Sequence, residues 1–254
     1  MPLAEAALLG PRPLALLVDL DDTIVSDSVR AGLNWAAAVE AAAAVVPFPA
    51  EAVLRAIEIE RDWYWSDPER NRVGRCNLIA ARRSIVTAAI RRAAIPEADI
   101  PTAVAAIVAA YGARTEADRG PFPGALDALR TFRELGIKLA LVTNGAAEVQ
   151  RAKIERFGLA ALVDVIVVEG ECGLGKPEPG VYAHALASLG VSAADAWMVG
   201  DNLDWDVVAP RRLGMRGIWI AMTPTALKGA VSDADGIVPD LPALAGLLSS
   251  MALR

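Results

Sequence analysis

Two acidic side chains stand two residues apart where an apolar run near the N-terminus ends. The run is Leu14–Val18, and Asp19 and Asp21 follow it. A run of this length is typical of a buried strand, and open parallel sheets bind ligands at the carboxyl ends of their strands. Carboxylates placed there either hold a cation or act as nucleophile and as acid or base. The pair by itself does not decide between these two kinds of site.

A hydroxyl and an amide follow a second apolar run farther along the chain. Thr143 and Asn144 precede Gly145 and then a helical pattern. Backbone N–H groups at such a turn and helix start suit a phosphate. The same residues are also common in ordinary turns, so the motif alone leaves both interpretations open.

A lysine lies in a segment that glycine and proline constrain. Pro177 and Pro179 stiffen this segment and Gly175 lets its backbone turn, which fixes Lys176 in place. The alternative is a solvated loop lysine. The spacing is not that of a P-loop, which needs Gly-x-x-x-x-Gly-Lys-Ser/Thr.

Three more acids fall within six residues after another apolar run: Asp201, Asp204 and Asp206. Asp201 directly ends a strand pattern, as Asp19 does. Asp204 and Asp206 fit a helix cap equally well.

A cation would let these strand ends meet. If Asp19, Asp21 and Asp201 converge, each pair repels by about 4 kcal/mol at about 4 Å and an effective dielectric constant of about 20. Such a cluster needs a cation or raised carboxyl pKa values. The chain has one histidine, which excludes a multi-histidine metal site, and oxygen ligands favour Mg²⁺ over zinc. With Lys176 as a second positive charge, the set suits a phosphoryl group.

The elements that must position these residues alternate between strand and helix. The strand patterns are Leu14–Leu20, Ile137–Thr143, Val163–Val168, Ala196–Gly200 and Gly217–Met222. The helical patterns between them are Ala125–Leu135, Ala147–Phe157, Val181–Leu189 and Val207–Leu213. Such alternation is typical of an α/β fold with a parallel sheet covered by helices on both faces.

More than a hundred residues separate the first two strands, and most of them have helical patterns. These patterns are Val29–Val46, Ala50–Trp65, Arg72–Ala94 and Thr102–Tyr111, with prolines between them. We predict a helical domain at residues 26–117, inserted into a core made of residues 1–25 and 118–254. Because it follows the first strand, we expect it to lie above the Asp19 site.

Composition narrows the class of protein. The chain has 254 residues, of which 54% are hydrophobic, so it can bury a sizeable core, and its net charge of −6 argues against a general nucleic-acid or membrane-surface binder. No apolar run approaches the ~20 residues of a membrane helix, and the N-terminus lacks the basic start of a signal peptide.

The chain has two cysteines, Cys76 and Cys172. They are too few for a disulfide framework, and we expect both to be buried. We therefore expect a cytoplasmic protein without nucleic-acid or membrane partners. The choice between a monomer and a homodimer stays open.

The four segments together resemble the haloacid dehalogenase-like superfamily of aspartyl-phosphate hydrolases. Their order along the whole chain is Asp19-x-Asp21-x-Thr23, Thr143-Asn144, Gly175-Lys176-Pro177, then Gly200-Asp201 with Asp206. The helical insertion is similar to the α-helical cap of the first type in this family. The resemblance implies a Rossmann-like three-layer core with an inserted cap that sets substrate specificity.

The resemblance also implies a role for each acid. Asp19 would be the nucleophile that forms an aspartyl-phosphate, and Asp21 would protonate the leaving oxygen and then activate water. The backbone carbonyl of Asp21 would bind Mg²⁺ together with Asp19. Asp201 would be a further side-chain ligand, and Asp206 would support the metal directly or through water.

Three other residues would hold the transferring phosphoryl group: Thr143, the Asn144 backbone and Lys176. The dehalogenases of the superfamily lack an acid at the position of Asp21, because halide leaves without a proton. The resemblance therefore implies a Mg²⁺-dependent phosphatase acting on a small phosphorylated metabolite. The alternatives are a sugar phosphomutase, a 2-haloacid dehalogenase and a non-catalytic binding protein on the same fold.

The segment from Arg70 to Arg92 contains seven arginines and no acid. Arg75 and Arg82 are seven residues apart, so they would share one helix face. We hypothesise that one or more of Arg72, Arg75 and Arg82 bind an anionic leaving group. The alternative is that these arginines pair with nearby acids.

Overall fold

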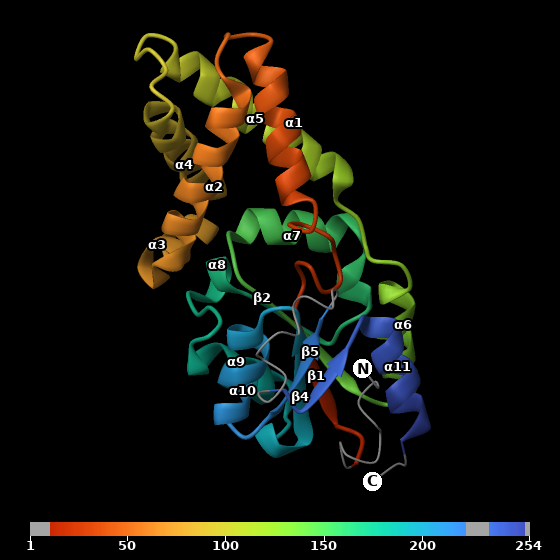
Figure 1. The fold of residues 1–254 in the computed structure, drawn as a ribbon. Helices are drawn as coiled ribbons and strands as arrows, with labels where there is room; N and C mark the ends of the chain where they lie inside the picture. Colours follow the sequence, from red (N-terminus) through yellow and green to blue (C-terminus); the bar gives the residue numbers. More distant parts are fainter. Residues whose placement is uncertain (1–10, 222–233, 252–254) are drawn as a thin grey trace. The chain divides into compact units, whose positions relative to one another are not determined.

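The chain forms two compact units, one of which is inserted into the other. The computed structural model describes residues 11–221 and 234–251. The units are Met1–Ser26 with Gly120–Arg254, called here the core unit, and Asp27–Arg119, called the helical unit (Figure 1). The helical unit was predicted at residues 26–117. In the structure it begins one residue later and ends two residues later.

Six parallel strands form the sheet of the core unit, in the order β3-β2-β1-β4-β5-β6. They are β1 (Ala15–Val18), β2 (Lys138–Thr143), β3 (Val165–Val168), β4 (Ala196–Gly200), β5 (Arg216–Ile220) and β6 (Gly236–Val238). This is the strand order of a Rossmann-like doubly wound sheet, in which ligands bind where the order reverses. The reversal lies at β1, whose Val18 is opposite Leu141 of β2 and Val199 of β4.

Helices cover both faces of this sheet, so the predicted three-layer α/β core is confirmed. Side chains of β1 alternate between the two faces: Leu16 and Val18 belong to one buried cluster, and Ala15 and Leu17 to another. The first cluster includes residues of α6 (Ala125–Glu134) and α11 (Leu241–Ser250), and the second includes residues of α9 (Pro179–Leu189). All four residues of β1 are fully buried, as expected of a central parallel strand.

Two details of the core unit differ from the prediction. The sequence pattern did not indicate β6, which is only three residues long, and the predicted last strand ended at Met222, which lies outside the described residues. The helix predicted at Val207–Leu213 is a π-helical turn, Leu203–Val208, followed by α10 (Ala209–Arg212).

Five helices make the helical unit and surround a core of their own. They are α1 (Ala31–Ala43), α2 (Ala50–Ser66), α3 (Pro68–Arg75), α4 (Leu78–Arg92) and α5 (Ile100–Asp118). Buried side chains of four of these helices form this core, namely Trp35, Ile57, Ile90 and Ile107.

The single helix predicted from Arg72 to Ala94 is wrong, because the chain breaks between α3 and α4. The side chain of Asn77 caps α4 by accepting a hydrogen bond from the backbone N–H of Ala80. Arg75 ends α3 and Arg82 lies in α4, so the two arginines do not share a helix face.

Two other expectations concern the surface. Cys76 and Cys172 are both exposed, so the prediction that they are buried is wrong. Within the described ranges, none of the helices is both long and apolar enough to cross a bilayer.

Candidate active site

The ends of three neighbouring strands bring the predicted polar residues together. Asp19 follows β1, Asp201 follows β4 and Thr143 ends β2. The backbone N–H of Asp19 donates to the carbonyl of Val199 at 3.0 Å, which continues the pairing of β1 with β4. The register of the sheet therefore places Asp19 between the other two strand ends.

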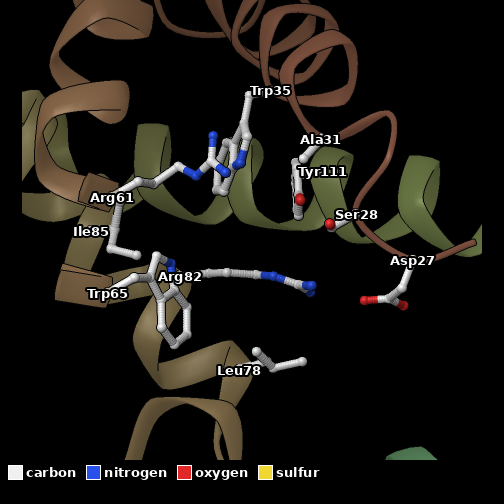
Figure 2. Close-up of a pocket in the computed structure, with 10 residues that line it drawn as sticks. All are labelled: Asp27, Ser28, Ala31, Trp35, Arg61, Trp65, Leu78, Arg82, Ile85 and Tyr111. Atoms are coloured by element: carbon white, nitrogen blue, oxygen red, sulfur yellow. The ribbon is translucent and has the colours of Figure 1, made fainter. Parts of the chain in front are cut away.

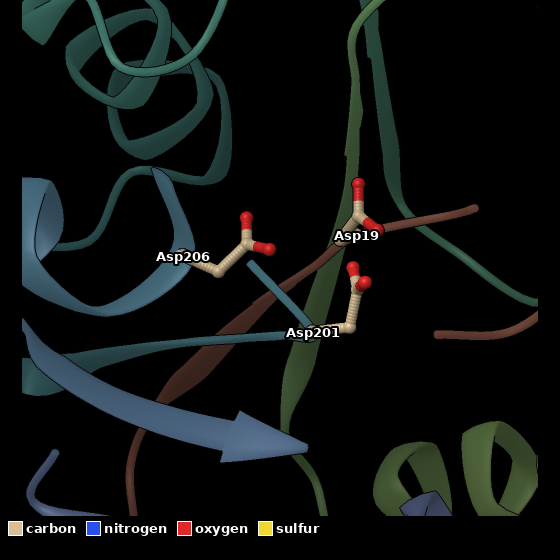
Figure 3. A group of neighbouring side chains, drawn as sticks. All are labelled: Asp19, Asp201 and Asp206. Carbon is tan, nitrogen blue, oxygen red and sulfur yellow. The ribbon is translucent and has the colours of Figure 1, made fainter. Parts of the chain in front are cut away.

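Three carboxylates form a cluster at this sheet edge. Asp19, Asp201 and Asp206 each offer an oxygen atom, and these atoms lie within 4.8 Å of one another (Figure 3). Asp19 and Asp206 are buried and Asp201 is half-buried. The side chain of Asp21 is not one of the three.

Burial and mutual repulsion make these carboxylates reluctant to ionise together. Burial, opposed by Lys176 and assisted by Asp206, raises the pKa of Asp19 to about 6. Burial raises the pKa of Asp201 to about 8, and repulsion from Asp19 and Asp206 contributes to this rise. Because the pKa values of Asp19 and Asp201 are raised, the cluster gains from a positive charge placed among its oxygens.

Lys176 supplies one such charge. The residue is 1% exposed, and Nζ donates to Oδ1 of Asp19 at 2.6 Å and to Oδ1 of Asp206 at 2.7 Å. Although burial alone would lower the pKa of Lys176, the two carboxylates raise it above its usual value. Lys176 is therefore a fixed, protonated cation, and not the solvated loop lysine that the sequence left open.

Asn144 holds the backbone of Lys176. Its Nδ2 donates to the Lys176 carbonyl at 2.7 Å, and its Oδ1 accepts from the Lys176 N–H at 2.7 Å. The sequence indicated only the Asn144 backbone, as a phosphate donor. The side chain links the end of β2 to the segment that carries the lysine.

Asp206 is part of the cluster and is not the helix cap. Besides binding Lys176, it accepts a hydrogen bond through Oδ2 from the backbone N–H of Asn202 at 3.0 Å. The cap of the π-helical turn is Asn202, whose side chain accepts from the N–H of Trp205. Asp204 is exposed.

Two buried residues of α7 (Ala147–Arg156) join the site, and sequence reasoning missed both. Lys153 Nζ donates to Oδ1 of Asp21 at 2.6 Å, and Gln150 Nε2 donates to Oδ2 of Asp21 at 2.8 Å. Gln150 also donates to the hydroxyl of Thr143. Gln150 is 2% exposed and Lys153 is 3% exposed. Their spacing of three on the helix after Thr143 is the signal that could have indicated a shared face.

Glu169 is another buried acid that sequence reasoning missed. It begins α8 (Glu169–Cys172), directly after β3, and its Oε2 accepts from the backbone N–H of Gly145 at 2.9 Å. This contact fixes the turn that follows Thr143 and Asn144.

The three predicted substrate arginines lie in the helical unit and have different surroundings. Arg72 is exposed and forms an ion pair with Glu69 at 2.9 Å. Arg75 donates to the side chain of Asn71 at 3.3 Å. Arg82 is half-buried, and burial lowers the pKa of its guanidinium.

The carboxylate cluster fits a divalent cation. Its three ligand atoms are carboxylate oxygens, which are the ligands that a hard cation prefers, and two of the three residues are buried. The cation could be held by the side chains of Asp19, Asp201 and Asp206.

Comparison with known proteins assigns a family. Residues 14–214 match the sequence profile of the haloacid dehalogenase-like hydrolases. The chain is also 33% identical over 223 residues to a phosphoserine phosphatase of Thermus thermophilus, with 81% of this chain and 87% of the relative covered.

Solved structures with the same fold include a dehalogenase. The HAD-hydrolase YfnB of Bacillus subtilis, bound to magnesium, superposes with a TM-score of 0.70 at 20% identity and covers 93% of this chain and 99% of its own. An L-2-haloacid dehalogenase of Xanthobacter autotrophicus superposes with a TM-score of 0.61 at 20% identity. The match covers 94% of this chain and 100% of the dehalogenase. Fold similarity therefore does not separate a phosphatase from a dehalogenase, and the residues of the site must do so.

Proposed function

Because the chain belongs to the haloacid dehalogenase-like hydrolases, we propose that it is a Mg²⁺-dependent phosphatase that hydrolyses a small phosphorylated metabolite through an aspartyl-phosphate. The observation that carries this proposal is the pair of acids after β1. Asp19 contacts a protonated lysine, and Asp21 is held separately by Lys153 and Gln150. These separate contacts support a reacting role for Asp19 and a proton-transfer role for Asp21.

In the first step, a carboxylate oxygen of Asp19 attacks phosphorus and the bond from phosphorus to the ester oxygen breaks. Asp21, protonated at that stage, gives its proton to the leaving alkoxide, which departs as an alcohol. This step divides a very slow hydrolysis into two easier displacements.

In the second step, Asp21, now a carboxylate, takes a proton from water as the water oxygen attacks phosphorus. The bond between phosphorus and the Asp19 oxygen breaks, which releases inorganic phosphate and restores the Asp19 carboxylate. Asp21 regains its proton, so the cycle closes without another reactant.

Negative charge on the transferring phosphoryl group needs fixed positive partners. Lys176 would supply one, and the Thr143 hydroxyl and the backbone N–H of Asn144 would donate hydrogen bonds. Mg²⁺ held by Asp19, Asp201, Asp206 and the Asp21 carbonyl would neutralise phosphate charge when bound. The positions of these residues at one sheet edge support these roles.

Asp21 favours a phosphatase over a dehalogenase, since a halide leaves without protonation. A phosphomutase uses the same acids but returns the phosphoryl group to a sugar. The relative named above favours O-phosphoserine as the first ester to test.

The test measures inorganic phosphate released from a panel of phosphate esters with Mg²⁺, with Asp19→Asn as the blank. We expect steady release by the natural protein and none by the variant. Equal release by both proteins, or phosphate kept on a sugar with none reaching water, would contradict the proposal.

A further inference from the structure

The side chain of Gln150 joins two polar groups that have different tasks in the proposed reaction. Its Nε2 donates to Oδ2 of Asp21 at 2.8 Å, to the Asn144 carbonyl at 2.9 Å and to the hydroxyl of Thr143. All four residues belong to the core unit, and Gln150 and Thr143 are buried. One amide on α7 thus links the proposed acid to the hydroxyl that is proposed to bind the phosphoryl group.

The partners of Gln150 decide which way its amide points. A backbone carbonyl has no hydrogen to donate, so the atom that faces the Asn144 carbonyl must be the amide nitrogen. This nitrogen has two N–H groups for three acceptors, and it does not accept hydrogen bonds itself. The hydroxyl of Thr143 can therefore only accept from Gln150.

The hydrogen of the Thr143 hydroxyl is consequently turned away from Gln150. Among the described residues, its acceptor is the Asn144 carbonyl at 3.4 Å, which is long for a hydrogen bond between two oxygen atoms. Gln150 already donates to that carbonyl at 2.9 Å. An anionic phosphoryl oxygen would be a stronger acceptor for this hydrogen.

Lys153 contacts the other oxygen of the acid. Its Nζ donates to Oδ1 of Asp21 at 2.6 Å, whereas Gln150 donates to Oδ2. The residues are three apart on α7, so they lie on one face of the helix. Together they hold both oxygens of Asp21, and Gln150 also reaches Thr143.

Buried or half-buried cations elsewhere in the chain are held less specifically. In a pocket of the helical unit, the guanidinium of Arg82 lies 4.9 Å from the centroid of the Tyr111 ring (Figure 2). A ring face attracts a cation without fixing the direction of each N–H group. The contacts of Gln150 and Lys153 go to individual oxygen atoms, so they can fix the orientation of a hydroxyl and a carboxyl group.

We propose that Gln150 is a positioning residue that turns the hydroxyl hydrogen of Thr143 toward the transferring phosphoryl group. Together with Lys153, it also holds the carboxyl group of Asp21 in place for proton transfer. The inference rests on the proposed function, since it assigns Gln150 an effect through two residues of that site. Loss of Gln150 should therefore weaken phosphate binding and slow proton transfer, and loss of Lys153 should slow proton transfer.

The first test measures binding of inorganic phosphate by calorimetry in the presence of Mg²⁺. Gln150→Met removes the amide donor without adding a charge. We expect the Kd to rise about 3- to 10-fold, as for the loss of a neutral hydrogen bond. Arg151→Met is the control, because Arg151 is exposed on the same helix, and it should change the Kd by less than about twofold, which is below the effect of such a bond.

A double-mutant cycle asks whether Gln150 acts through Thr143. Thr143→Val removes the hydroxyl at nearly the same size. In that background, Gln150→Met should change the phosphate Kd by less than about twofold, because no hydroxyl is left to orient. Thr143→Ser keeps the hydroxyl and should keep the sensitivity to Gln150→Met. An effect of Gln150→Met that is as large without the hydroxyl as with it would overturn the proposal.

The second test compares two esters that differ in their need for a proton. Nitrophenolate leaves 4-nitrophenyl phosphate without protonation, whereas the alkoxide of an alkyl ester needs a proton from Asp21. On the best alkyl ester, Lys153→Met should lower kcat/KM about 10- to 100-fold, as for the loss of a charged hydrogen bond, and on the aryl ester by less than about threefold. Gln150→Met should lower both values, and the alkyl value more. Equal losses on the two esters in both variants would overturn the link to proton transfer.

Phosphate binding separates this inference from the proposed function. If the cycle shows the expected coupling but no ester releases phosphate, the phosphatase fails and the link between Gln150 and Thr143 stands. If esters are hydrolysed, Asp19→Asn abolishes hydrolysis and the cycle shows no coupling, the inference fails and the phosphatase stands.

A second variant covers the case in which Gln150→Met does not fold. Gln150→Glu keeps the size of the side chain, and its carboxylate would draw the Thr143 hydrogen to itself. The phosphate Kd should then rise by more than about tenfold, since the hydroxyl is lost as a donor and a negative charge is added. Phosphate binding as tight as in the natural protein would overturn the proposal.

Discussion

The side chain of Asn144 forms two reciprocal hydrogen bonds with the backbone of Lys176, both 2.7 Å long. The residues come from different segments, the end of β2 and the loop after α8, and this link sets where the lysine enters the carboxylate cluster. The side chain of Lys176 contacts both Asp19 and Asp206, so a shift of its backbone would disturb both contacts.

Asn144→Leu removes both bonds at similar side-chain size. We expect kcat to fall about 10- to 100-fold, because two hydrogen bonds contribute roughly 1–3 kcal/mol and each 1.4 kcal/mol changes a rate tenfold. Phosphate release at saturating ester measures this. A kcat within twofold of the natural protein would show that the link does not position Lys176.

Lys176→Met leaves two buried carboxylates without their cation. We expect the free energy of unfolding to fall by about 3–5 kcal/mol in metal-free protein, as when one partner of a buried ion pair is removed. Urea unfolding in chelator measures the change, and activity should be lost as well. Lys138→Met is the control, since Lys138 donates to a single backbone carbonyl and to no carboxylate that the structure describes. Equal losses of stability in the two variants would contradict the assigned role.

The raised carboxyl pKa values predict how stability depends on pH without metal. The pKa of Asp201 rises from 3.8 to about 8, so between these pH values the folded protein binds more protons than the unfolded chain. The free energy of unfolding should therefore fall as the pH rises through this window. Thermal unfolding in chelator at about pH 5 and about pH 8 checks the sign.

Asp201→Asn should flatten this pH dependence, because it removes the carboxyl group whose pKa rises more than that of Asp19. Asp204→Asn, an exposed acid on the same segment, should leave it unchanged. Adding Mg²⁺ should recover part of the stability lost at the higher pH. A metal-free protein that is more stable at the higher pH would contradict the burial of these acids.

Gly200 must be a glycine because the carboxylate of Asp206 occupies the space of a β-carbon. Gly200→Ala should displace Asp206 and weaken its contacts with Lys176 and Asn202. We expect weaker binding of Mg²⁺, measured by calorimetry, and lower activity. Gly246→Ala in α11 meets no atom within 4 Å and should be neutral or stabilising by about 0.4–1 kcal/mol. Similar Mg²⁺ affinity in both variants would refute this prediction.

Lys153→Met tests the contact of α7 with Asp21. Losing this partner should lower kcat about 10- to 100-fold, since a hydrogen bond to a charged group contributes about 1.5–3 kcal/mol. Arg151→Met is the matched control, because Arg151 is exposed on the same helix and pairs with Glu171. If both variants keep their kcat, Lys153 does not position Asp21.

The sequence predicted the parts of the site that end strands. Asp19, Thr143 and Asp201 each follow an apolar run, and the pattern of a buried parallel strand is strong enough to place such ends at one sheet edge. Lys176 was identified by its glycine and proline neighbours. These signals are local, so they could be read from the sequence without knowing the strand order.

The missed residues depend on contacts between distant segments. Gln150 and Lys153 differ from other polar helix residues only in which face packs toward Asp21. Asp206 had two equally good local interpretations, and only its contact with Lys176 distinguishes them. The break at Asn77 was hidden because the arginine-rich sequence on both sides has helical propensity, and the capping bond that separates α3 from α4 is a single side-chain contact.

The position of β1 in the sheet bears on the order in which the chain can fold during synthesis. Both neighbours of β1, namely β2 and β4, are made after the helical unit. The ribosome therefore releases an apolar strand, then a unit with its own buried core, and only much later the strands that cover the first one. Until Gly200 has emerged, β1 has an unpaired edge, and a stalled or truncated chain would expose it to aggregation.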